Sequence, residues 1–333
     1  MLDARHDVLG IGNAIVDILA MADDAFLIRE GLAKGSMNLV DEARSTHLYE
    51  AMGPAVEASG GSAANTIAGV ASLGGRGAYI GKIKADDTGR FFTHDMRAIG
   101  VTFDVAPLIE GPATAKSMIF VTPDGERTMN TFLGACHRLT PDDVDPDLVA
   151  GSAVTYMEGY LWDPPAAKEA FLKAAAIAHG AGRRVAITLS DSFCVDRFRD
   201  EFLHLMRSGI VDTVFANEHE LHALYQTADF DTALAALRAD TRLGIVTRSE
   251  NGAIVVEKDE TVIGRAFAID RLVDTTGAGD LFAAGFLHGL TRGFAHAASL
   301  KLGALAAAEV IQHMGPRPQV SLRALAQDHG LPV

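Results

Sequence analysis

A glycine-rich stretch near the end of the chain, Asp274-Thr-Thr-Gly-Ala-Gly-Asp280, combines two groups that phosphoryl transfer needs. The N–H groups of Gly277, Ala278 and Gly279 stand before an apolar helical pattern, and free amides at a helix N-terminus bind anions. Such donors stabilise the charge on a transferring phosphoryl group. Asp280 could accept the proton of an attacking hydroxyl as a general base. The alternative is an ordinary helix start, in which the dipole favours Asp280.

A second polar stretch, Ser59-Gly-Gly-Ser-Ala-Ala-Asn65, has the residue types of a site for a hydroxylated ligand. Adjacent Gly60 and Gly61 allow a ligand to lie against the main chain. Asn65 offers both a donor and an acceptor to a pair of sugar hydroxyls. The alternative is a loop in which Ser62 caps the following helix.

A third stretch, Gly12-Asn13-Ala-Ile-Val-Asp17, leaves the end of a predicted strand, where α/β proteins place their ligands. The carboxylate of Asp17 can accept two vicinal hydroxyls at once, so it could hold a ribose-like diol, with Asn13 beside it. The alternative is a solvated loop acid.

These stretches need a scaffold in which strands and helices alternate. Buried strands are expected at residues 7–12, 77–81, 153–157, 184–189, 212–216 and 243–247. Helices are expected at residues 63–73, 87–99, 165–181, 195–208, 232–239, 280–290 and 295–312. This alternation predicts an α/β fold with a mainly parallel central sheet and helices on both faces.

Two segments interrupt the alternation. Residues 114–133 predict a β-hairpin that turns at Pro123-Asp-Gly125, and residues 14–38 are strand-like and irregular. We therefore expect a small discontinuous β-rich lid made of residues 14–40 and 101–134. The large nucleotide-binding and catalytic domain would comprise residues 1–13, 41–100 and 135–333.

The charge balance of the 333-residue chain argues against several classes of partner. It has 43 Asp plus Glu against 29 Lys plus Arg, a formal net charge of -14, which repels nucleic acids and anionic membrane surfaces. Cys136 and Cys194 cannot form a disulfide framework, and no apolar stretch reaches the ~18 residues of a membrane helix. A charged N-terminus without a secretory signal favours the cytoplasm. We expect small-molecule partners, with monomer and homodimer both open.

Two familiar nucleotide motifs are incomplete. Gly10-Ile-Gly12 follows a predicted strand, but Ile15 stands at the third glycine position of the dinucleotide fingerprint, which disfavours a dinucleotide-dependent oxidoreductase. Gly81-Lys82 lacks the upstream glycine and the following Ser or Thr of a Walker loop. Any nucleotide phosphate must be bound in another way.

The stretches Gly60–Asn65 and Asp274–Asp280 resemble the two signatures of the ribokinase-like (PfkB) family of sugar and nucleoside kinases, in the expected order and with a family-like separation. The resemblance covers nearly the whole chain and implies the ribokinase-like fold and ATP as the phosphoryl donor. It also implies that the motif from Asn217 to Glu220 positions Mg²⁺ and its waters. The same motif could be a helix cap closed by Glu220.

The resemblance further assigns nucleotide contacts to Thr247 and Gly252, and it allows a K⁺ site at Asp274 and Thr276. The chain departs from the family at Arg248-Ser249, where many members have an apolar residue and then glycine. The resemblance therefore does not define the adenine-nucleotide contacts at this turn.

Within the family, three features resemble adenosine kinases rather than ribokinases or fructokinases: Ser62, the stretch from Arg127 to Ala135, and the stretch from Val310 to Arg317. The implied reaction is ATP-dependent phosphorylation of the 5′-hydroxyl of a ribonucleoside, foremost adenosine, with Arg127 on the phosphate oxygens. A kinase for ribose, fructose or a sugar acid is the nearest alternative, and a non-catalytic nucleotide- or sugar-sensing module is a more distant one. Residues that could form an apolar wall for the base, or simply pack, are Leu39, Phe120, Tyr160, Leu161 and Trp162.

Overall fold

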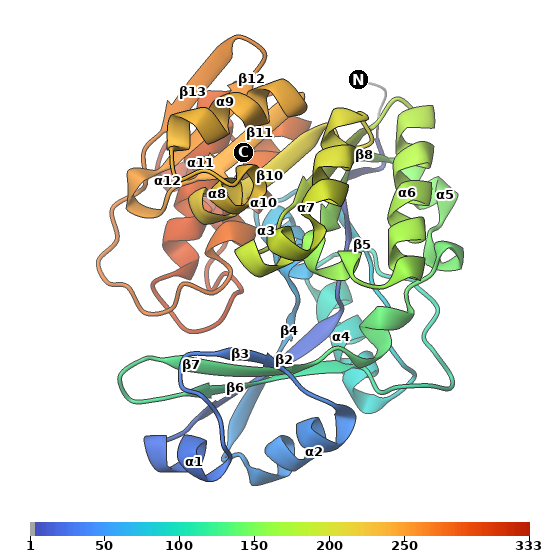
Figure 1. The fold of residues 1–333 in the computed structure, drawn as a ribbon, viewed down its shortest axis with the longest axis vertical. Helices are drawn as coiled ribbons and strands as arrows, with labels where there is room; N and C mark the ends of the chain where they lie inside the picture. Colours follow the sequence, from blue (N-terminus) through green and yellow to red (C-terminus); the bar gives the residue numbers. More distant parts are fainter. Residues whose placement is uncertain (1–3) are drawn as a thin grey trace.

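Two sheets of unequal size carry the fold of residues 4–333, the part of the chain that the computed structural model describes (Figure 1). In the large sheet the strands lie in the order β13 (Glu260–Gly264), β12 (Ala253–Glu257), β11 (Leu243–Thr247), β10 (Thr213–Asn217), β9 (Arg184–Thr188), β8 (Ser152–Glu158), β1 (His6–Ile11) and β5 (Gly77–Ile80). Neighbours from β5 to β11 are parallel, whereas β12 and β13 pair antiparallel. The predicted α/β fold with a mainly parallel sheet is confirmed.

Helices cover both faces of the large sheet because successive strand residues point to opposite sides. Val8 and Leu9, adjacent in β1, belong to different cores. One core lies under α5 (Pro146–Ala150), α6 (Pro165–Gly180), α7 (Ser192–Arg207), α8 (Glu218–Tyr225) and α9 (Phe230–Asp240). The other lies under α3 (Ser62–Ser72), α4 (Asp87–Ala98), α10 (Ala278–Thr291) and α11 (His296–Val310), with α12 (Leu322–Asp328) packed outside.

The small sheet forms the lid, with strands in the order β3 (Met37–Leu39), β7 (Arg127–Phe132), β6 (Ala115–Val121), β2 (Ile15–Met21) and β4 (Ala55–Gly60). Helices α1 (Asp24–Arg29) and α2 (Glu42–Ala51) cover its outer face, where Phe26 and Leu48 pack on Phe120. The other face looks toward the large domain (Figure 1). The predicted hairpin is confirmed, since β6 and β7 pair antiparallel on either side of Pro123-Asp-Gly125.

The lid boundaries differ from the prediction in two places. Strand β4 pairs antiparallel with β2, so residues 55–60 belong to the lid sheet, and α2 packs on the same sheet. Residues 101–108 instead run along the large domain, where Thr102 bridges Ala78 and Leu108 bridges Lys84. The physical reason is that β4 begins with three exposed residues and ends in small ones, so it lacks the apolar alternation that marks a strand.

Short 3-10 helices lie at Gly134–Arg138, Pro141–Asp143, Gly159–Trp162 and Ser249–Asn251. No helix within residues 4–333 combines the length and the apolar character that a membrane crossing requires. The prediction about the charged N-terminus rests partly on residues 1–3, which lie outside the described residues.

Candidate active site

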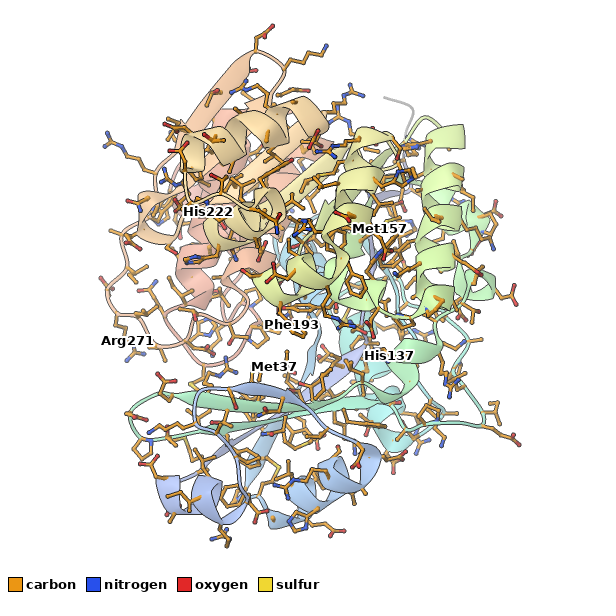
Figure 2. The ribbon with its side chains drawn as sticks, in the orientation of Figure 1. Met37, His137, Met157, Phe193, His222 and Arg271 are labelled. Carbon is orange, nitrogen blue, oxygen red and sulfur yellow. The ribbon has the colours of Figure 1, made fainter. Side chains whose placement is uncertain are left out.

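The three polar stretches of the sequence meet at the carboxyl ends of β1 and β8, beside the lid. Asn13 follows β1 and bonds to Glu158 at the end of β8, while Ser62 at the start of α3 bonds to Asp280 at the start of α10. Open α/β sheets bind ligands at this edge because the strand ends and helix N-termini converge there. Figure 2 places Met37 of the lid and Phe193 of α7 on facing sides of this region.

Asp280 lies in the first turn of α10 and is held by two donors from α3. The Ser62 hydroxyl donates to one of its carboxylate oxygens at 2.6 Å, and the Asn65 side-chain amide donates to the other at 2.9 Å. Burial raises the pKa of Asp280, while these two hydrogen bonds and the charge of Arg317 oppose the rise. The carboxylate is therefore fixed in direction and kept basic, as a general base requires.

The turn before Asp280 offers fewer free amides than the sequence suggested. The N–H of Ala278 donates to Thr275 O at 3.2 Å, whereas no acceptor for the N–H of Gly277 or Gly279 occurs in the described part of the chain. Gly277 has a positive φ of 78°, and a Cβ there would lie 2.9 Å from atoms of Pro316. Only glycine fits this cap, and the N–H groups of Gly277 and Gly279 are the ones left free for an anion at the positive end of α10.

The polar stretch from Ser59 to Asn65 holds Asp280, and its own helix, α3, has no hydrogen bond from the side chain of its N-cap residue. The N-cap of α3 is Gly61, so the alternative in which Ser62 caps the helix is wrong. Asn65, predicted to hold a sugar, directs its N–H₂ group to Asp280, and its carbonyl oxygen is buried without a partner among the described groups. That oxygen is the remaining acceptor of Asn65 toward a ligand.

Glu158 accepts the hydrogen bond that a capping side chain would otherwise take at the start of α3. The sequence did not predict this residue as part of the site. Its carboxylate accepts from the N–H of Ala63 at 2.9 Å, the side chain of Asn13 at 2.6 Å and the N–H of Asn13 at 3.3 Å. Burial raises its pKa to about 7, against the opposing effect of these bonds. Asn13, predicted to bind substrate, is thus buried and turned to Glu158. A charged residue at the end of a buried strand was the available signal.

Asp17 points from β2 of the lid into the site. Of the carboxylates there, it has the fewest hydrogen-bond donors among the described residues. It is buried, yet no side chain or N–H within residues 4–333 donates to it. Gly60 lies directly beside it, and a Cβ at Gly60 would collide with its carboxylate. Burial raises the pKa of Asp17 to about 7, and Arg127 and Arg317 pull it down. A buried carboxylate with free lone pairs suits two neighbouring ligand hydroxyls.

Arg127 reaches from β7 of the lid to the turn before α10. Its Nη1 donates to Asp274 Oδ1 at 2.5 Å and to the Thr276 hydroxyl, so its guanidinium occupies the pair to which the resemblance assigned K⁺. Its Nε and Nη2 are buried without a partner among the described residues. These two nitrogens carry three N–H groups that are available to an anion, and the contact with phosphate stays a prediction.

The nucleotide and Mg²⁺ candidates occupy the next strand ends of the same edge. Asn217 and Thr247 are register partners at the ends of β10 and β11. Asn217 and Glu220 close a capping box, which confirms the structural alternative, and burial raises the pKa of Glu220 to about 7. The Glu220 carboxylate also faces that of Asp280, so it belongs electrostatically to the site.

The departure at Arg248-Ser249 has a structural explanation. The guanidinium of Arg248 lies 3.9 Å from the ring centroid of Phe230 and donates to Glu218 at 3.0 Å, so its charge is turned to α8 and α9. Ser249 has a φ of 49° and Gly252 a φ of 83°, both in the left-handed region. The turn keeps a glycine-like backbone although serine stands in it.

Three of the predicted base-wall residues belong to the core instead. Phe120 packs on Phe26 at the outer face of the lid, and Leu161 and Trp162 are buried under α6 and α7. The two exposed candidates are Leu39, 60% exposed, and Tyr160, 39% exposed. Met37, 49% exposed, and Phe193, 68% exposed, lie on facing sides of the site and were missed.

Comparison with known proteins gives consistent relatives. The model of the pfkB family of carbohydrate kinases matches residues 45–322. The adenosine kinase of Sinorhizobium meliloti is 60% identical, with a TM-score of 0.92 over 98% of this chain and 100% of that one. The probable sugar kinase of Rhizobium etli CFN 42 is 57% identical, with a TM-score of 0.93 over 99% of this chain and 100% of that one. The adenosine kinase of Saccharomyces cerevisiae is 28% identical over 92% of this chain and 95% of that protein.

Proposed function

Because the chain belongs to the pfkB family of carbohydrate kinases, and is an ATP-dependent phosphotransferase, we propose that its acceptor is the 5′-hydroxyl of a ribonucleoside, foremost adenosine. The observation that carries the proposal is the Asp280 carboxylate, which two donors from α3 fix beside the free amides of Gly277 and Gly279. A base and an anion site on one turn match an alcohol attacking phosphorus.

In the proposed reaction Asp280 takes the proton of the 5′-hydroxyl as that oxygen bonds to the γ-phosphorus of ATP. The bond from phosphorus to the β–γ bridging oxygen breaks, and ADP leaves. The N–H groups of Gly277 and Gly279 and the two free nitrogens of Arg127, Nε and Nη2, stabilise the charge on the transferring oxygens. Asp17 and the carbonyl oxygen of Asn65 accept hydrogen bonds from the ribose hydroxyls, which orients the 5′-carbon.

The residues near Glu220 fit Mg²⁺ through water rather than by direct ligation. Both carboxylate oxygens of Glu220 already accept from Asn217, at 2.6 and 3.0 Å, and the carboxylate is buried. We propose that Glu220 and Asn217 hold waters of the ion, in keeping with the hydration that Mg²⁺ retains in proteins. When bound, the ion would neutralise charge on the phosphates of ATP.

The apolar surface at the mouth of the site favours a nucleoside over a free sugar. Leu39 and Met37 of the lid and Phe193 of α7 expose apolar side chains that a purine base would cover. A free sugar would leave them in water. A sugar kinase stays the second candidate, because the similar Rhizobium protein is named a probable sugar kinase.

A side-by-side assay of adenosine, inosine, ribose and fructose with ATP and Mg²⁺ tests the proposal. We expect kcat/KM for adenosine to exceed that for either sugar by about 100-fold or more, the scale of a buried apolar group plus hydrogen bonds. A higher kcat/KM for ribose or fructose would replace the proposal by the sugar-kinase alternative. Absence of turnover with all four would contradict the nucleoside proposal and leave only the sugar-acid form of the alternative.

A further inference from the structure

The segment from Met314 to Arg317, between α11 and α12, contacts both polar turns of the site. Gly315 donates its N–H to Asp274 Oδ2 at 2.9 Å, and the buried Pro316 lies against Gly277. Arg317 continues to the other turn, so four consecutive residues join the anion site to the stretch that holds Asp280. Two prolines, Pro316 and Pro318, restrict the backbone on either side of Arg317.

The guanidinium of Arg317 donates hydrogen bonds to the backbone and to one side chain of the stretch from Ser59 to Ala64. Its Nε donates to Ser59 O at 2.9 Å, its Nη2 to the Ser59 hydroxyl at 2.9 Å and its Nη1 to Ala64 O at 3.1 Å. These acceptors lie on either side of Gly60, Gly61 and Ser62. A planar group with three such bonds fixes the turn more firmly than a single donor could.

Arg317 carries a partly buried charge without a carboxylate in direct contact. Within residues 4–333 its nitrogens donate only to neutral acceptors, namely the oxygens of Ser59 and Ala64 and the Met96 sulfur. The charged groups that it faces are Asp17, Asp95 and Asp280. Asp95 is bound to Ser59, whereas Asp17 and Asp280 belong to the proposed reaction.

We propose that Arg317 is a positioning residue that clamps the stretch from Ser59 to Ala64 so that Ser62 and Asn65 meet Asp280, and that supplies the positive charge opposite that base. The inference rests on the proposed role of Asp280 but on no particular acceptor. Loss of the clamp would loosen the hydrogen bonds from Ser62 and Asn65 to Asp280. Loss of the Arg317 charge would raise the pKa of Asp280, because a nearby positive charge favours the ionised carboxylate, as those hydrogen bonds do.

Other titratable groups also face Asp280, and the test must separate them from Arg317. They are Asp17, Glu158, Glu220, Tyr156 and Tyr160. All five are neutral or negative, so Arg317 is the positive group acting on Asp280. Removing its charge should therefore shift the acidic limb of activity upward in pH, whereas a change of packing alone would leave that limb in place.

The experiment compares Arg317→Gln and Arg317→Lys with the wild type and with Arg292→Gln, a control at the far end of α10. With any acceptor that the wild type phosphorylates, we expect kcat of Arg317→Gln to fall about 10- to 100-fold, with KM for ATP within about twofold. The acidic limb of its kcat/KM profile should move up by about one pH unit. In Arg317→Lys the acidic limb should lie at its wild-type pH, because the charge is kept. Only part of kcat should return, since an ammonium cannot make the three bonds of the guanidinium.

If Arg317→Gln folds and its acidic limb is unshifted, the Arg317 charge does not act on Asp280. If its kcat is unchanged, the hydrogen bonds of Arg317 do not position the groups that hold Asp280. If Arg317→Gln does not fold, Ser59→Ala removes one of the three bonds of Arg317, together with the bond from the Ser59 hydroxyl to Asp95, and keeps the charge of Arg317. We expect a lower kcat with an unshifted acidic limb, and wild-type kcat would count against the clamp. If the wild type phosphorylates none of the acceptors, the proposed function fails separately. The carbon-13 titration of Asp280, assigned with Asp280→Asn, then still tests whether Arg317→Lys and Arg317→Gln differ in its pKa.

Discussion

The carboxylates that the large domain brings to the site have all their hydrogen-bond donors within the protein, whereas the charged groups of the lid are only partly bonded or not bonded at all. Asp280, Glu158 and Glu220 each accept at least two hydrogen bonds from neighbouring residues. Asp17 of the lid accepts none from the described residues, and Arg127 leaves two nitrogens free. On the proposed function, the large domain holds the proposed catalytic groups in a fixed geometry, and the lid holds groups whose hydrogen bonds a ligand would complete.

The largest effect on activity should follow from a change in the large domain, at Asp280. Replacing Asp280 by Asn keeps its size but removes the basic oxygen, so we expect kcat to fall about 10²- to 10⁴-fold. Adenosine binding, measured by calorimetry, should stay within about threefold. Asp259→Asn, in the exposed turn between β12 and β13, is the matched control and should behave as wild type. Turnover near the wild-type rate in Asp280→Asn would contradict its role as base.

A second effect should appear in stability, at Glu158. Its pKa is about 7 in the folded protein against an ordinary value of 4.5, so the folded state binds the proton more tightly than the unfolded state does. The free energy of unfolding should therefore fall as pH rises from about 4.5 to about 7. For this one residue the loss is at most about 3 kcal/mol.

Urea unfolding at pH 5 and pH 8 measures this effect. We expect Glu158→Gln to lose less stability than the wild type between the two pH values, because glutamine does not ionise. Glu169→Gln, at an exposed position of α6, should keep the wild-type difference. An equal pH difference in Glu158→Gln and the wild type would show that Glu158 has an ordinary pKa.

A smaller effect is expected on the lid side, at Asp17. Asp17→Asn removes the charge and one acceptor from a group that only the ligand completes, so KM for the acceptor should rise about tenfold or more. The value of kcat should change less than about threefold, since the base is untouched. Glu57→Gln, on the exposed part of β4, serves as the control. A loss confined to kcat would mean that Asp17 acts in the chemical step, like Asp280, rather than in binding the acceptor.

The smallest effect concerns K⁺, because Arg127 already places a positive charge on Asp274 and Thr276. We expect the wild-type rate to change less than about twofold when choline replaces K⁺ at equal ionic strength. In Arg127→Gln that charge is lost, so K⁺ should raise the rate above that in choline. A strong K⁺ requirement in the wild type would mean that Arg127 leaves this position when substrates bind.

The sequence predicted the large domain better than the details of the site. Continuous apolar runs such as Leu243–Thr247 identify buried parallel strands, and glycine-rich stretches before helices led to the residues that meet at one edge of the sheet. Strand β4 was missed because small and exposed residues carry no alternation. The partners of Asn13, Asn65 and Arg317 could not be predicted, because each bond joins residues more than a hundred positions apart. The spacing of residues in the sequence thus identified the polar groups but not their hydrogen-bond partners.

The lid also sets the order in which the chain can fold. Strand β2 pairs in parallel with β6, so Ile15 must find Ala115, whereas β6 and β7 form a local hairpin. Local hairpins form early, and parallel pairing between distant segments is slow because the intervening loop must close first. We expect the edge of β2 that pairs with β6 to stay unpaired until the hairpin exists, whereas its other edge pairs with the nearer strand β4. A nascent or refolding chain therefore exposes an aggregation-prone strand for as long as Asp17 is away from its place.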